Sequence, residues 1–446
     1  MGLRVTVVGL ARSGVGAANL LDSMGASVTV TDSRPEASLA EQVSRLSPGI
    51  ARALGSHPDA LFTDADLVVI SPGVPLDAPP LVKAREAGVA ITGELELAYT
   101  ASGSPFIAIT GTNGKSTTTT LVGKMLEAAG LKVFVGGNLG NALTEEPDKL
   151  KGKDYVVAEV SSFQLETVSA FRPRISAVLN ITQDHLDRYA NMEGYARAKA
   201  MVFKNQGEGD LLVLNADDPP TLSLKDNARC GVSLFSSKAV VEKGAYVKDG
   251  MLVHTDGTGV EAYILPVKEI RIKGAHNVEN ALAAVAVSMA AGADPASVAK
   301  VLREFPGLEH RMEFVRELDG VTYINDSKGT NVGAVMKSLE GFDNPVILIA
   351  GGLDKHSDFA PLKPVIKARV KKLILIGKAA DVMFDVLGGE TDTVKAGNSL
   401  ADAVDIARKS ASPGEVVLLS PACASFDMFK DFEDRGRQFK DMVGKL

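Results

Sequence analysis

The chain has 446 residues, too many for one hydrophobic core, and roughly 100–200 residues per domain predicts two to four domains. Hydrophobic residues make up 45% and charged residues 23% of it, a composition typical of a globular protein and unlike that of a disordered one. The formal net charge of -7 argues against a global basic field for nucleic acid or anionic lipid. Binding of anionic ligands must therefore depend on local sites.

Cysteine usage and apolar runs bear on the compartment. Cys230 and Cys423 are far apart in sequence and fit no metal spacing, so a reducing cytosol is expected. The apolar run at residues 3–10 is too short to span a membrane and is followed at once by Arg12, which predicts a first β-strand rather than a signal peptide. The apolar helical pattern near residues 281–293 is also too short to span and predicts a core helix.

Short β-branched runs recur along the chain, and each ends in a loop bearing Gly or Asp before a helical pattern begins. Continuous apolar strands that alternate with helices indicate parallel sheets covered on both faces, with ligands beyond the carboxyl ends of the strands. The predicted strands of this kind are 5–8, 67–70, 106–109, 155–158, 346–350, 373–376 and 416–419. Residues 229–270 differ, because short alternating runs with Asp-Gly turns at 249–250 and 256–257 predict a small antiparallel section.

Two turn-rich stretches, residues 101–105 and 305–308, indicate domain boundaries. They predict domains at 1–100, 101–306 and 307–446, each with its own sheet. The predicted fold class is α/β in three domains. The N-terminal domain is Rossmann-like, the central domain resembles a phosphate-loop ATPase with a mostly parallel sheet and the small antiparallel section, and the C-terminal domain is again Rossmann-like.

The strongest local signal is Thr110-Gly-Thr-Asn-Gly-Lys-Ser-Thr117, between a predicted strand and a predicted helix at about 116–129. Its glycines let backbone N–H groups turn toward an anion, Lys115 supplies a point charge for the β- and γ-phosphates, and the hydroxyls suit Mg²⁺. Ile109 stands where a standard Walker A motif has its first glycine, and a tight strand-to-helix turn without a ligand is the alternative. The candidate ATP-binding residues here are Gly111, Thr112, Asn113, Gly114, Lys115, Ser116 and Thr117.

Further motifs follow the next predicted strands. Glu159 ends the strand at 155–158, where a carboxylate beside a phosphate loop is a candidate Mg²⁺ ligand. The segment Asn180-Ile-Thr-Gln-Asp-His-Leu-Asp187 follows another strand, although a histidine such as His185 is by itself more often a cap or a surface residue. Lys199, in Tyr-Ala-Arg-Ala-Lys, would on its own be a solvated helix lysine. Gly274-Ala-His-Asn-Val-Glu-Asn280 opens the Ala-rich helix and is compatible with simple capping.

The C-terminal third carries motifs at further strand ends. Leu308-Glu-His-Arg-Met-Glu313 follows the second boundary, and Asn325-Asp-Ser-Lys-Gly-Thr-Asn331 and Gly351-Gly-Leu-Asp-Lys355 follow two strands. Turn chemistry explains the glycines about as well as function does. The lysines at 328 and 355 are harder to explain that way, because both would face a cleft. The last motif is a serine-aromatic stretch, Ser420-Pro-Ala-Cys-Ala-Ser-Phe-Asp-Met-Phe429, followed by Phe432 and Arg435-Gly-x-x-Phe439. Phe429 and Phe432 also suit a core.

At the N-terminus, Gly9-Leu-Ala-Arg-Ser-Gly14 follows the first predicted strand, and Asp32 ends the second. This pattern is a Rossmann fingerprint with Ala11 in place of the middle glycine. By itself it is weak evidence for a nicotinamide cofactor.

Taken in chain order, these motifs resemble those of the Mur ligase and folylpolyglutamate synthetase superfamily, and the serine-aromatic stretch resembles that of its D-glutamate-adding branch. The diaminopimelate-adding branch is disfavoured because no Asp-Asn-Pro-Arg motif is present. The resemblance implies an ATP-dependent ligase that joins D-glutamate to UDP-N-acetylmuramoyl-L-alanine through an acyl phosphate. It further implies ATP and two Mg²⁺ ions, a monomer in the cytoplasm, and no nucleic-acid partner or membrane insertion.

The resemblance also assigns roles to single residues. Glu159 would hold the metal that bridges the phosphates, His185 would serve a second metal site, and Lys199, carbamylated by CO₂, would become an anion that helps to hold Mg²⁺. The implied catalytic residues are Lys115, Glu159, His185, Lys199, Arg311 and Lys328, the metal ligands are Ser116, Glu159, His185 and Lys199, and the ATP site adds Asn277, Arg311 and Asp326. The implied substrate contacts are Ser13, Asp32, Ser33, Arg34, Gly73, Asn138, Ser161, Gln164, Lys328, Thr330, Lys355, Ser425, Phe426 and Phe432.

Other functions remain open at this point. A nicotinamide-dependent oxidoreductase would explain the N-terminal loop but leave the phosphate loop unexplained. A non-enzymatic nucleotide switch would explain the phosphate loop but not the C-terminal lysines. Other Mur ligases and folylpolyglutamate synthases are closer alternatives, and the serine-aromatic stretch discriminates against them by resemblance.

Overall fold

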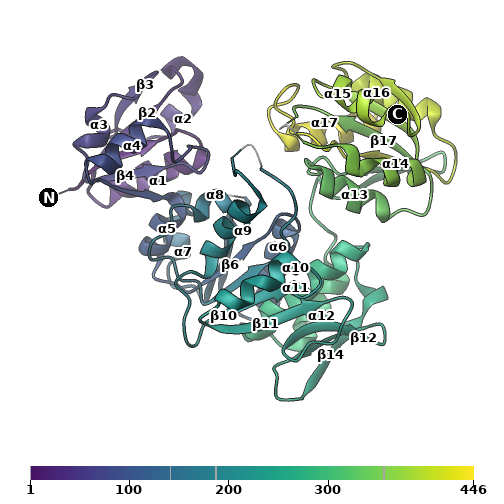
Figure 1. The fold of residues 1–446 in the computed structure, drawn as a ribbon, viewed down its shortest axis with the longest axis horizontal. Helices are drawn as coiled ribbons and strands as arrows, with labels where there is room; N and C mark the ends of the chain where they lie inside the picture. The colour runs from purple at the N-terminus through teal and green to yellow at the C-terminus, as the bar shows by residue number, and fades with distance from the viewer. Residues whose placement is uncertain (1, 141, 186–187, 355–356) are drawn as a thin grey trace. The chain divides into compact units, whose positions relative to one another are not determined.

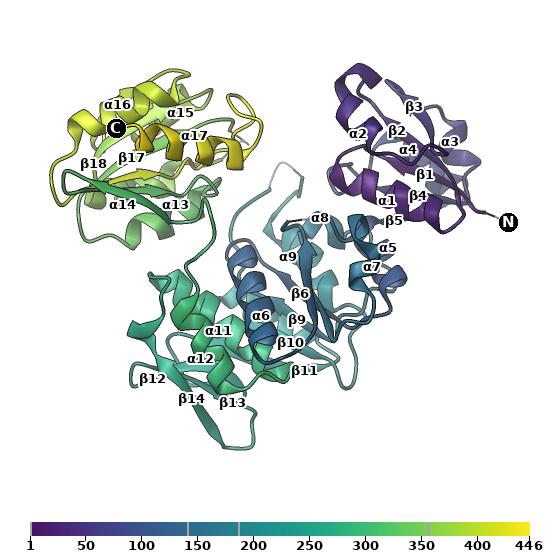
Figure 2. The same ribbon diagram turned by 180° about the vertical axis from the view of Figure 1, so that it is seen from behind.

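The computed structural model describes residues 2–140, 142–185, 188–354 and 357–446, and the strands in these ranges form three sheets (Figures 1 and 2). The chain separates into two compact units, the first with residues 1–181, 191–269 and 279–303, the second with residues 182–190, 270–278 and 304–446. Across the described residues, helices that are both long and apolar enough to cross a bilayer are absent. The domain boundaries at 101–105 and 305–308 stay a prediction.

The N-terminal sheet is wholly parallel and has the strand order β3-β2-β1-β4-β5. Its elements are β1 (Arg4–Val8), α1 (Arg12–Ser23), β2 (Ser27–Asp32), α2 (Ala40–Ser44), β3 (Ala51–Leu54), α3 (Ala60–Thr63), β4 (Leu67–Ile70), α4 (Pro79–Glu86), β5 (Ala90–Gly93) and α5 (Glu94–Ser102). Val5 and Val7 pack with α1 on one face, whereas Val8 packs with Phe62 and Leu81 on the other. The crossovers change direction between β1 and β4, which makes this point the ligand-binding position of a doubly wound sheet.

The central sheet has the order β14-β13-β12-β11-β10-β9-β6-β8-β7. Its elements are β6 (Phe106–Thr110), α6 (Lys115–Ala128), β7 (Val133–Gly137), η2 (Leu143–Glu145), α7 (Pro147–Leu150), β8 (Tyr155–Glu159), α8 (Ser162–Leu165), β9 (Ile175–Val178), α9 (Met192–Ala200), β10 (Leu211–Asn215), α10 (Pro219–Leu222), β11 (Gly231–Ser236), β12 (Gly244–Lys248), β13 (Met251–Thr255), β14 (Glu261–Pro266), α11 (Ala275–Ala290) and α12 (Pro295–Glu304). Strand β6 lies between β8 and β9, with Ile109 opposite Glu159 and Thr110 opposite Val178. The loops that follow these three strands therefore meet at one edge of the sheet.

The small antiparallel section is confirmed for β12, β13 and β14. Asp249 and Gly250 join β12 to β13 with φ of 50° and 73°, as a two-residue hairpin turn requires. The prediction is wrong for β11, which also lies within residues 229–270 but pairs in parallel with both β10 and β12. The connection from β10 to β11 runs through α10, and such a crossover returns the chain in the parallel direction.

The C-terminal sheet has the order β15-β16-β20-β17-β18-β19. Its elements are β15 (Glu313–Leu318), β16 (Val321–Asn325), α13 (Val332–Glu340), β17 (Val346–Gly351), α14 (Lys363–Arg369), β18 (Val370–Ile376), α15 (Ala380–Leu387), β19 (Asp392–Lys395), α16 (Leu400–Ser410), β20 (Val416–Leu419) and α17 (Phe432–Gly444). Ile347 and Ile349 of β17 pack with α16 and α17, while Leu348 and Ala350 pack with α13, α14 and α15. Helices therefore cover both faces, and the predicted three-domain α/β class is confirmed.

Candidate active site

Two segments lie at the switch point of the N-terminal sheet: residues 9–14, which lead from β1 into the first turn of α1, and residues 71–73, which follow β4. Gly9 adopts φ 87°, and its carbonyl accepts a hydrogen bond of 2.8 Å from Ser71 Oγ. A Cβ on Gly14 would lie 1.9 Å from that same carbonyl oxygen, so the turn into α1 requires glycine. Ser13 lies in the first turn of α1 and Gly73 on the loop after β4, and their contact with a diphosphate stays a prediction.

Asp32, at the end of β2, accepts hydrogen bonds from other groups of the protein. Its oxygens accept Arg34 Nε at 3.0 Å, Arg34 Nη2 at 2.8 Å and the Leu10 N–H at 2.8 Å. Burial alone would raise the pKa of Asp32, but the hydrogen bonds from Arg34 and Leu10 outweigh it and lower the pKa to about 2. In a nicotinamide-binding domain the acid at this position bonds the ribose. Here Asp32 orients Arg34 and the glycine turn, with the predicted contact Ser33 exposed between them.

The phosphate loop makes the turn from β6 into α6. Gly114 adopts φ 83° directly before the helix, and Lys115 is the first helical residue. Lys115 Nζ donates to the carbonyls of Gly111 at 3.0 Å and Thr112 at 2.8 Å, so the ammonium lies over the loop. The hydroxyl residues at 116 and 117 are buried in the first turn of α6. This arrangement suits an anion at a helix N-terminus.

Two asparagines brace this loop, and the sequence reasoning did not assign either a role. Asn180, which follows β9, accepts the Asn113 N–H at 2.8 Å and donates to the Asn113 carbonyl at 3.1 Å. Asn280 of α11 lies so close that a Cβ on Gly114 would be 2.2 Å from its Oδ1. Both asparagines stand in the motifs noted above. The signal that could have identified them is their position: Asn180 stands at a strand end and Asn280 inside a helix, where a polar amide needs a partner.

Glu159 is buried at the end of β8, next to the phosphate loop across the sheet. Its Oε1 accepts a hydrogen bond of 2.7 Å from Asn138 Nδ2, which connects a predicted metal ligand to a predicted substrate contact. Ser161 and Gln164 form a capping box at the start of α8. Gln164 Nε2 donates to Glu94 at 3.3 Å, and burial raises the pKa of this carboxyl despite its hydrogen bonds.

Lys199 is not a solvated helix lysine, because its exposed fraction is 1%. Its Nζ donates to the Gly111 carbonyl at 2.8 Å and lies 4.4 Å from the centroid of the Tyr195 ring. The Tyr195 hydroxyl is in turn 3.4 Å from Thr112 Oγ1. The amine of Lys199 is therefore directed at the phosphate loop, where the resemblance puts the modified lysine.

In the second unit, His185 and Thr330 line a cavity of about 370 Å³. His185 adopts φ 56°, and Asn331, beside Thr330, donates a hydrogen bond of 3.2 Å to Asp184. Within the part of the chain that the structure describes, no three His, Cys, Asp or Glu side chains are grouped to hold a metal ion. The metal site therefore stays a prediction.

The predicted adenine and phosphate residues of the second unit lie among buried polar groups. Asn277 Nδ2 donates to the Lys273 carbonyl at 2.8 Å in the first turn of α11. Burial, with the charges of Lys337 and Arg311, lowers the pKa of His276 to about 4, so this imidazole is neutral. Asp326 accepts the hydroxyls of serines 338 and 420 at 2.8 and 2.6 Å. Burial raises the pKa of Asp326, although these hydroxyls and Arg311 oppose the shift.

Two residues predicted to contact the amino-acid substrate lie together at the edge of the C-terminal sheet. Lys328, after β16, places its Nζ 3.7 Å from the centroid of the Phe432 ring at the start of α17. Ser425 is buried on the loop after β20, whereas the next residue, Phe426, is 68% exposed. Lys355 lies outside the described residues.

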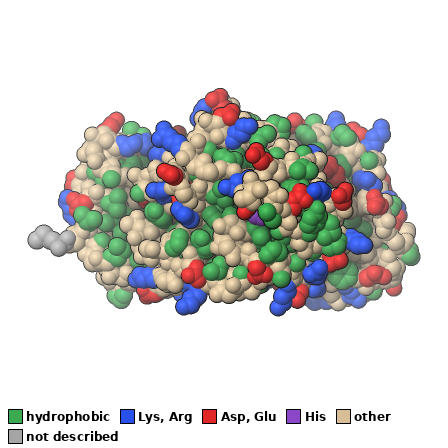
Figure 3. Space-filling view, turned by 90° about the horizontal axis from the view of Figure 1, so that it is seen from below, with side chains coloured by type: hydrophobic (Ala, Val, Ile, Leu, Met, Phe, Trp, Pro, Cys, Tyr) green, Lys and Arg blue, Asp and Glu red, His purple; other side chains and the backbone are tan. Residues whose placement is uncertain are grey.

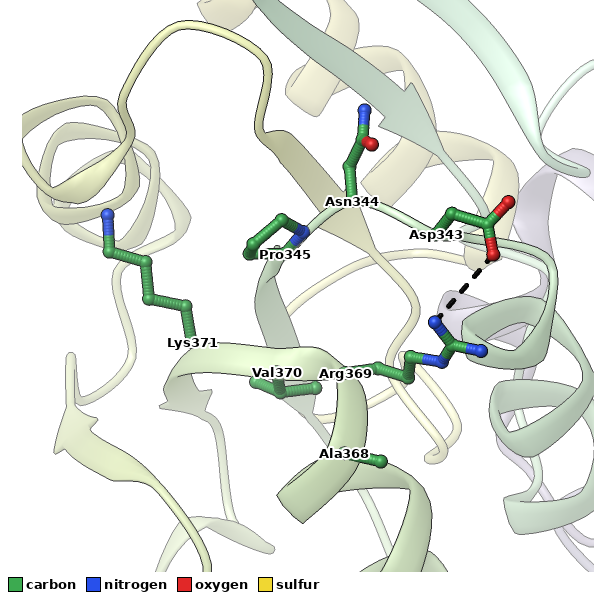
Figure 4. Close-up of a pocket in the computed structure, with 7 residues that line it drawn as sticks. All are labelled: Asp343, Asn344, Pro345, Ala368, Arg369, Val370 and Lys371. Carbon is green, nitrogen blue, oxygen red and sulfur yellow. Dashed lines mark ion pairs between the residues drawn. The ribbon is translucent and has the colours of Figure 1, made fainter.

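A smaller cavity of about 210 Å³ lies at the opposite edge of the same sheet, before β17 and β18 (Figure 4). Asp343 and Arg369 line it and face each other at 3.8 Å. Ligands of parallel sheets bind beyond the carboxyl ends of strands, so this edge is not the candidate active site. On the face shown in Figure 3, basic and acidic side chains are interspersed, in keeping with local rather than global anion binding.

These loops define a protein with a phosphate-loop turn in its central domain and candidate ligand-binding loops at the strand ends of its other two α/β domains. The sequence models of three domains match the chain in order. The Mur ligase MurD-like N-terminal domain matches residues 3–93, the Mur ligase middle domain residues 109–288, and the Mur ligase glutamate ligase domain residues 310–423. The chain belongs to the Mur ligase family.

Two curated relatives carry the name UDP-N-acetylmuramoylalanine–D-glutamate ligase. That of Pelotomaculum thermopropionicum is 46% identical over 99% of this chain and 98% of its own length, and that of Geotalea uraniireducens is 47% identical over 99% and 97%. Among solved structures, a pseudomurein peptide ligase of Methanothermus fervidus has a TM-score of 0.64 at 18% identity and covers 100% of both chains. The UDP-N-acetylmuramate–alanine ligase of Thermotoga maritima has a TM-score of 0.63 at 21% identity over 99% of both. At these identities the two structures show the fold alone.

Proposed function

We propose that the chain joins D-glutamate to UDP-N-acetylmuramoyl-L-alanine with consumption of ATP, as a step in the synthesis of a peptidoglycan precursor. The observation that carries the proposal is the identity of 46% and 47%, over 99% of the chain, with relatives named for this activity. The phosphate loop at the start of α6 and the contact between Lys328 and Phe432 support it. Both cysteines are free thiols, which fits the proposed cytoplasmic location. The monomeric state stays a prediction.

The chemistry follows from the poor reactivity of a carboxylate toward an amine. The L-alanyl carboxylate attacks the γ-phosphorus of ATP, and the bond to the β-phosphate oxygen breaks, which gives an acyl phosphate and ADP. The amine of D-glutamate then attacks the acyl carbon. The amine loses a proton and the tetrahedral intermediate expels phosphate, leaving the amide. Lys115 and Arg311 would offset negative charge on the transferring phosphoryl group.

The residues around the phosphate loop fit a magnesium nucleotide. Glu159 is a buried carboxylate at the strand end beside the loop, and Ser116 presents a hydroxyl from the first turn of α6. Lys199 is buried with its amine toward Gly111, where the resemblance puts the lysine that reacts with CO₂. These groups would hold Mg²⁺, which offsets phosphate charge. His185, in the second unit, would serve a second metal ion.

The test is the substrate dependence of ADP release by the purified chain. We expect release to require UDP-N-acetylmuramoyl-L-alanine and D-glutamate together. Replacing D-glutamate by L-glutamate, or the acceptor by UDP-N-acetylmuramate with L-alanine, should abolish it. Turnover with a pteroate acceptor and L-glutamate, and none with the muramoyl substrate, would overturn the proposal in favour of a folylpolyglutamate synthase.

A further inference from the structure

Arg435, in α17, is a fully buried guanidinium to which the proposed chemistry assigns no role. Its exposed fraction is 0%, and it has the largest of the fully buried side chains among the described residues. Burial lowers the pKa of Arg435 to about 10, so the group stays charged at neutral pH. A buried charge of this kind persists only where its N–H donors find partners. The positions of those partners therefore indicate what the residue does.

The partners of Arg435 lie on two loops that are remote in sequence. Its Nε donates to Ser327 Oγ at 2.9 Å, and Nη2 donates to the Ser327 carbonyl at 2.8 Å, in the loop after β16. Nη1 and Nη2 each donate to the Cys423 carbonyl at 3.3 Å, and Nη1 reaches the Ala424 carbonyl at 3.5 Å, in the loop after β20. One planar fork thus connects the ends of two adjacent parallel strands.

Each of these contacts lies next to a residue predicted to hold the amino-acid substrate. Ser327 directly precedes Lys328, and its Oγ also donates to the Phe432 carbonyl at 2.8 Å. The other loop contact, at residue 424, directly precedes Ser425. Phe432 lies three residues before Arg435 in α17, and its ring is 3.7 Å from Lys328 Nζ. The three substrate positions are therefore set through bonds that converge on one guanidinium.

Backbone hydrogen bonds also hold these loops, one to the other and to the loop after β17, independently of this side chain. The Ala422 N–H donates to the Gly329 carbonyl at 2.8 Å, and residues 353 and 424 form an antiparallel bridge. These backbone bonds remain when Arg435 is replaced by a shorter side chain, and they keep the loops at the sheet edge. A conservative change at 435 therefore alters the spacing of the substrate side chains more than it alters the fold.

We propose that Arg435 is a positioning residue for the amino-acid substrate, which fixes Lys328, Ser425 and Phe432 relative to one another. This inference rests on the proposed function, because that function assigns these three side chains to D-glutamate. The described bonds of the guanidinium end on protein atoms, so it acts through its neighbours rather than by touching substrate. Binding of D-glutamate should depend on it far more than binding of ATP or of the nucleotide substrate does.

The main test is Arg435→Lys, which keeps the charge but loses the planar fork. We expect the KM for D-glutamate to rise about tenfold, the change that follows from losing roughly one net hydrogen bond to a charged group. The KM values for ATP and for the UDP-linked acceptor should stay within about twofold, as for contacts left intact. The kcat at saturating D-glutamate should stay close to that of the wild type. The matched control is Arg437→Lys on the same helix, an exposed arginine 3.9 Å from Asp431, which should change none of these constants.

A second variant, Ser327→Ala, removes the hydroxyl between Arg435 and Phe432 and should raise the KM for D-glutamate selectively as well. It decides the question alone if thermal unfolding shows that Arg435→Lys does not fold. A uniform rise in all three KM values, or an unchanged KM for D-glutamate in a folded variant, would overturn the inference. A wild-type chain that does not consume D-glutamate would instead overturn the proposed function, so the two failures are distinguishable.

Discussion

The contact between Gly114 and Asn280 leads to a prediction that separates backbone strain from side-chain collision. Gly114 precedes α6 with φ 83°, and Gly130 follows the same helix with φ 85°. A Cβ on Gly130 meets nothing within 4 Å, whereas a Cβ on Gly114 lies 2.2 Å from Asn280 Oδ1. Alanine at either position adopts the same unfavourable backbone region. The collision with Asn280 applies to Gly114→Ala alone.

The expected magnitudes follow from two costs, that of left-handed backbone and that of the collision with Asn280. Left-handed backbone for a residue with a Cβ costs about 1–2 kcal/mol, and this is the whole expected effect of Gly130→Ala. In Gly114→Ala, Asn280 must also withdraw by about 1 Å to reach an ordinary contact of 3.4 Å. Displacing a buried amide from its place costs a further ~1–3 kcal/mol. Since Asn280 lies against the phosphate loop, that part should appear in nucleotide binding.

The assay is ATP affinity by calorimetry, because a chain of three domains is not expected to unfold in two states. Gly114→Ala should weaken ATP binding ~10-fold or more, and Gly130→Ala should leave it unchanged. In an Asn280→Ala background, Gly114→Ala should lose most of its effect, as coupled neighbours do. An equal loss of affinity in both backgrounds would refute the reasoning, because the requirement for glycine would then come from the backbone alone.

Three further predictions concern charged groups. Lys115→Ala should lower phosphate release at saturating ATP by ~10²-fold, as for one preorganised electrostatic contact, and near-normal turnover would contradict its place on the phosphates. Lys199→Ala should abolish turnover and regain part of it with a short-chain carboxylic acid; an active, Mg²⁺-loaded wild type that shows no carbamate signal by NMR after exposure to ¹³CO₂ would contradict the modification. Because the folded-state pKa of Asp32 is lowered from 3.8 to about 2, its contribution to stability is present above about pH 4 and lost as the pH falls toward 2. Asp32→Asn should therefore flatten the loss of thermal stability between pH 5 and 2.5, and parallel curves for the two proteins would count against it.

The strands that the sequence predicted correctly are those buried on both faces. Val346–Ala350 is a continuous apolar run, and Val5–Val8 is apolar except for Thr6, because helices cover both sides of their sheets. Strands β15 and β19 were not predicted, since both are sheet edges in which charged residues stand among the apolar ones. Their strand conformation depends on a partner that local periodicity does not reveal.

The site divides along a similar line. The phosphate loop could be predicted because glycines and a lysine at fixed spacing act within one short segment. The bonds that brace the loops could not, because they join distant residues. Asn180 is 67 residues from Asn113, and Arg435 is 108 residues from Ser327. Such pairs become neighbours only once the strand order of each sheet is set.

Each sheet uses a polar side chain with little or no exposure to brace a loop at the carboxyl ends of its strands. Asp32 holds the glycine turn of the N-terminal sheet, Asn180 holds the phosphate loop, and Arg435 connects the two loops of the C-terminal sheet. Loops at a sheet edge have few apolar contacts and would otherwise be the least stable parts of the fold. A buried polar group stabilises such a loop because its hydrogen bonds are directional and because losing them costs free energy. An apolar side chain of equal volume would fill the same space without specifying an angle. Chemistry that must align a phosphoryl group, a carboxylate and an amine therefore accounts for polar rather than apolar residues at these three places.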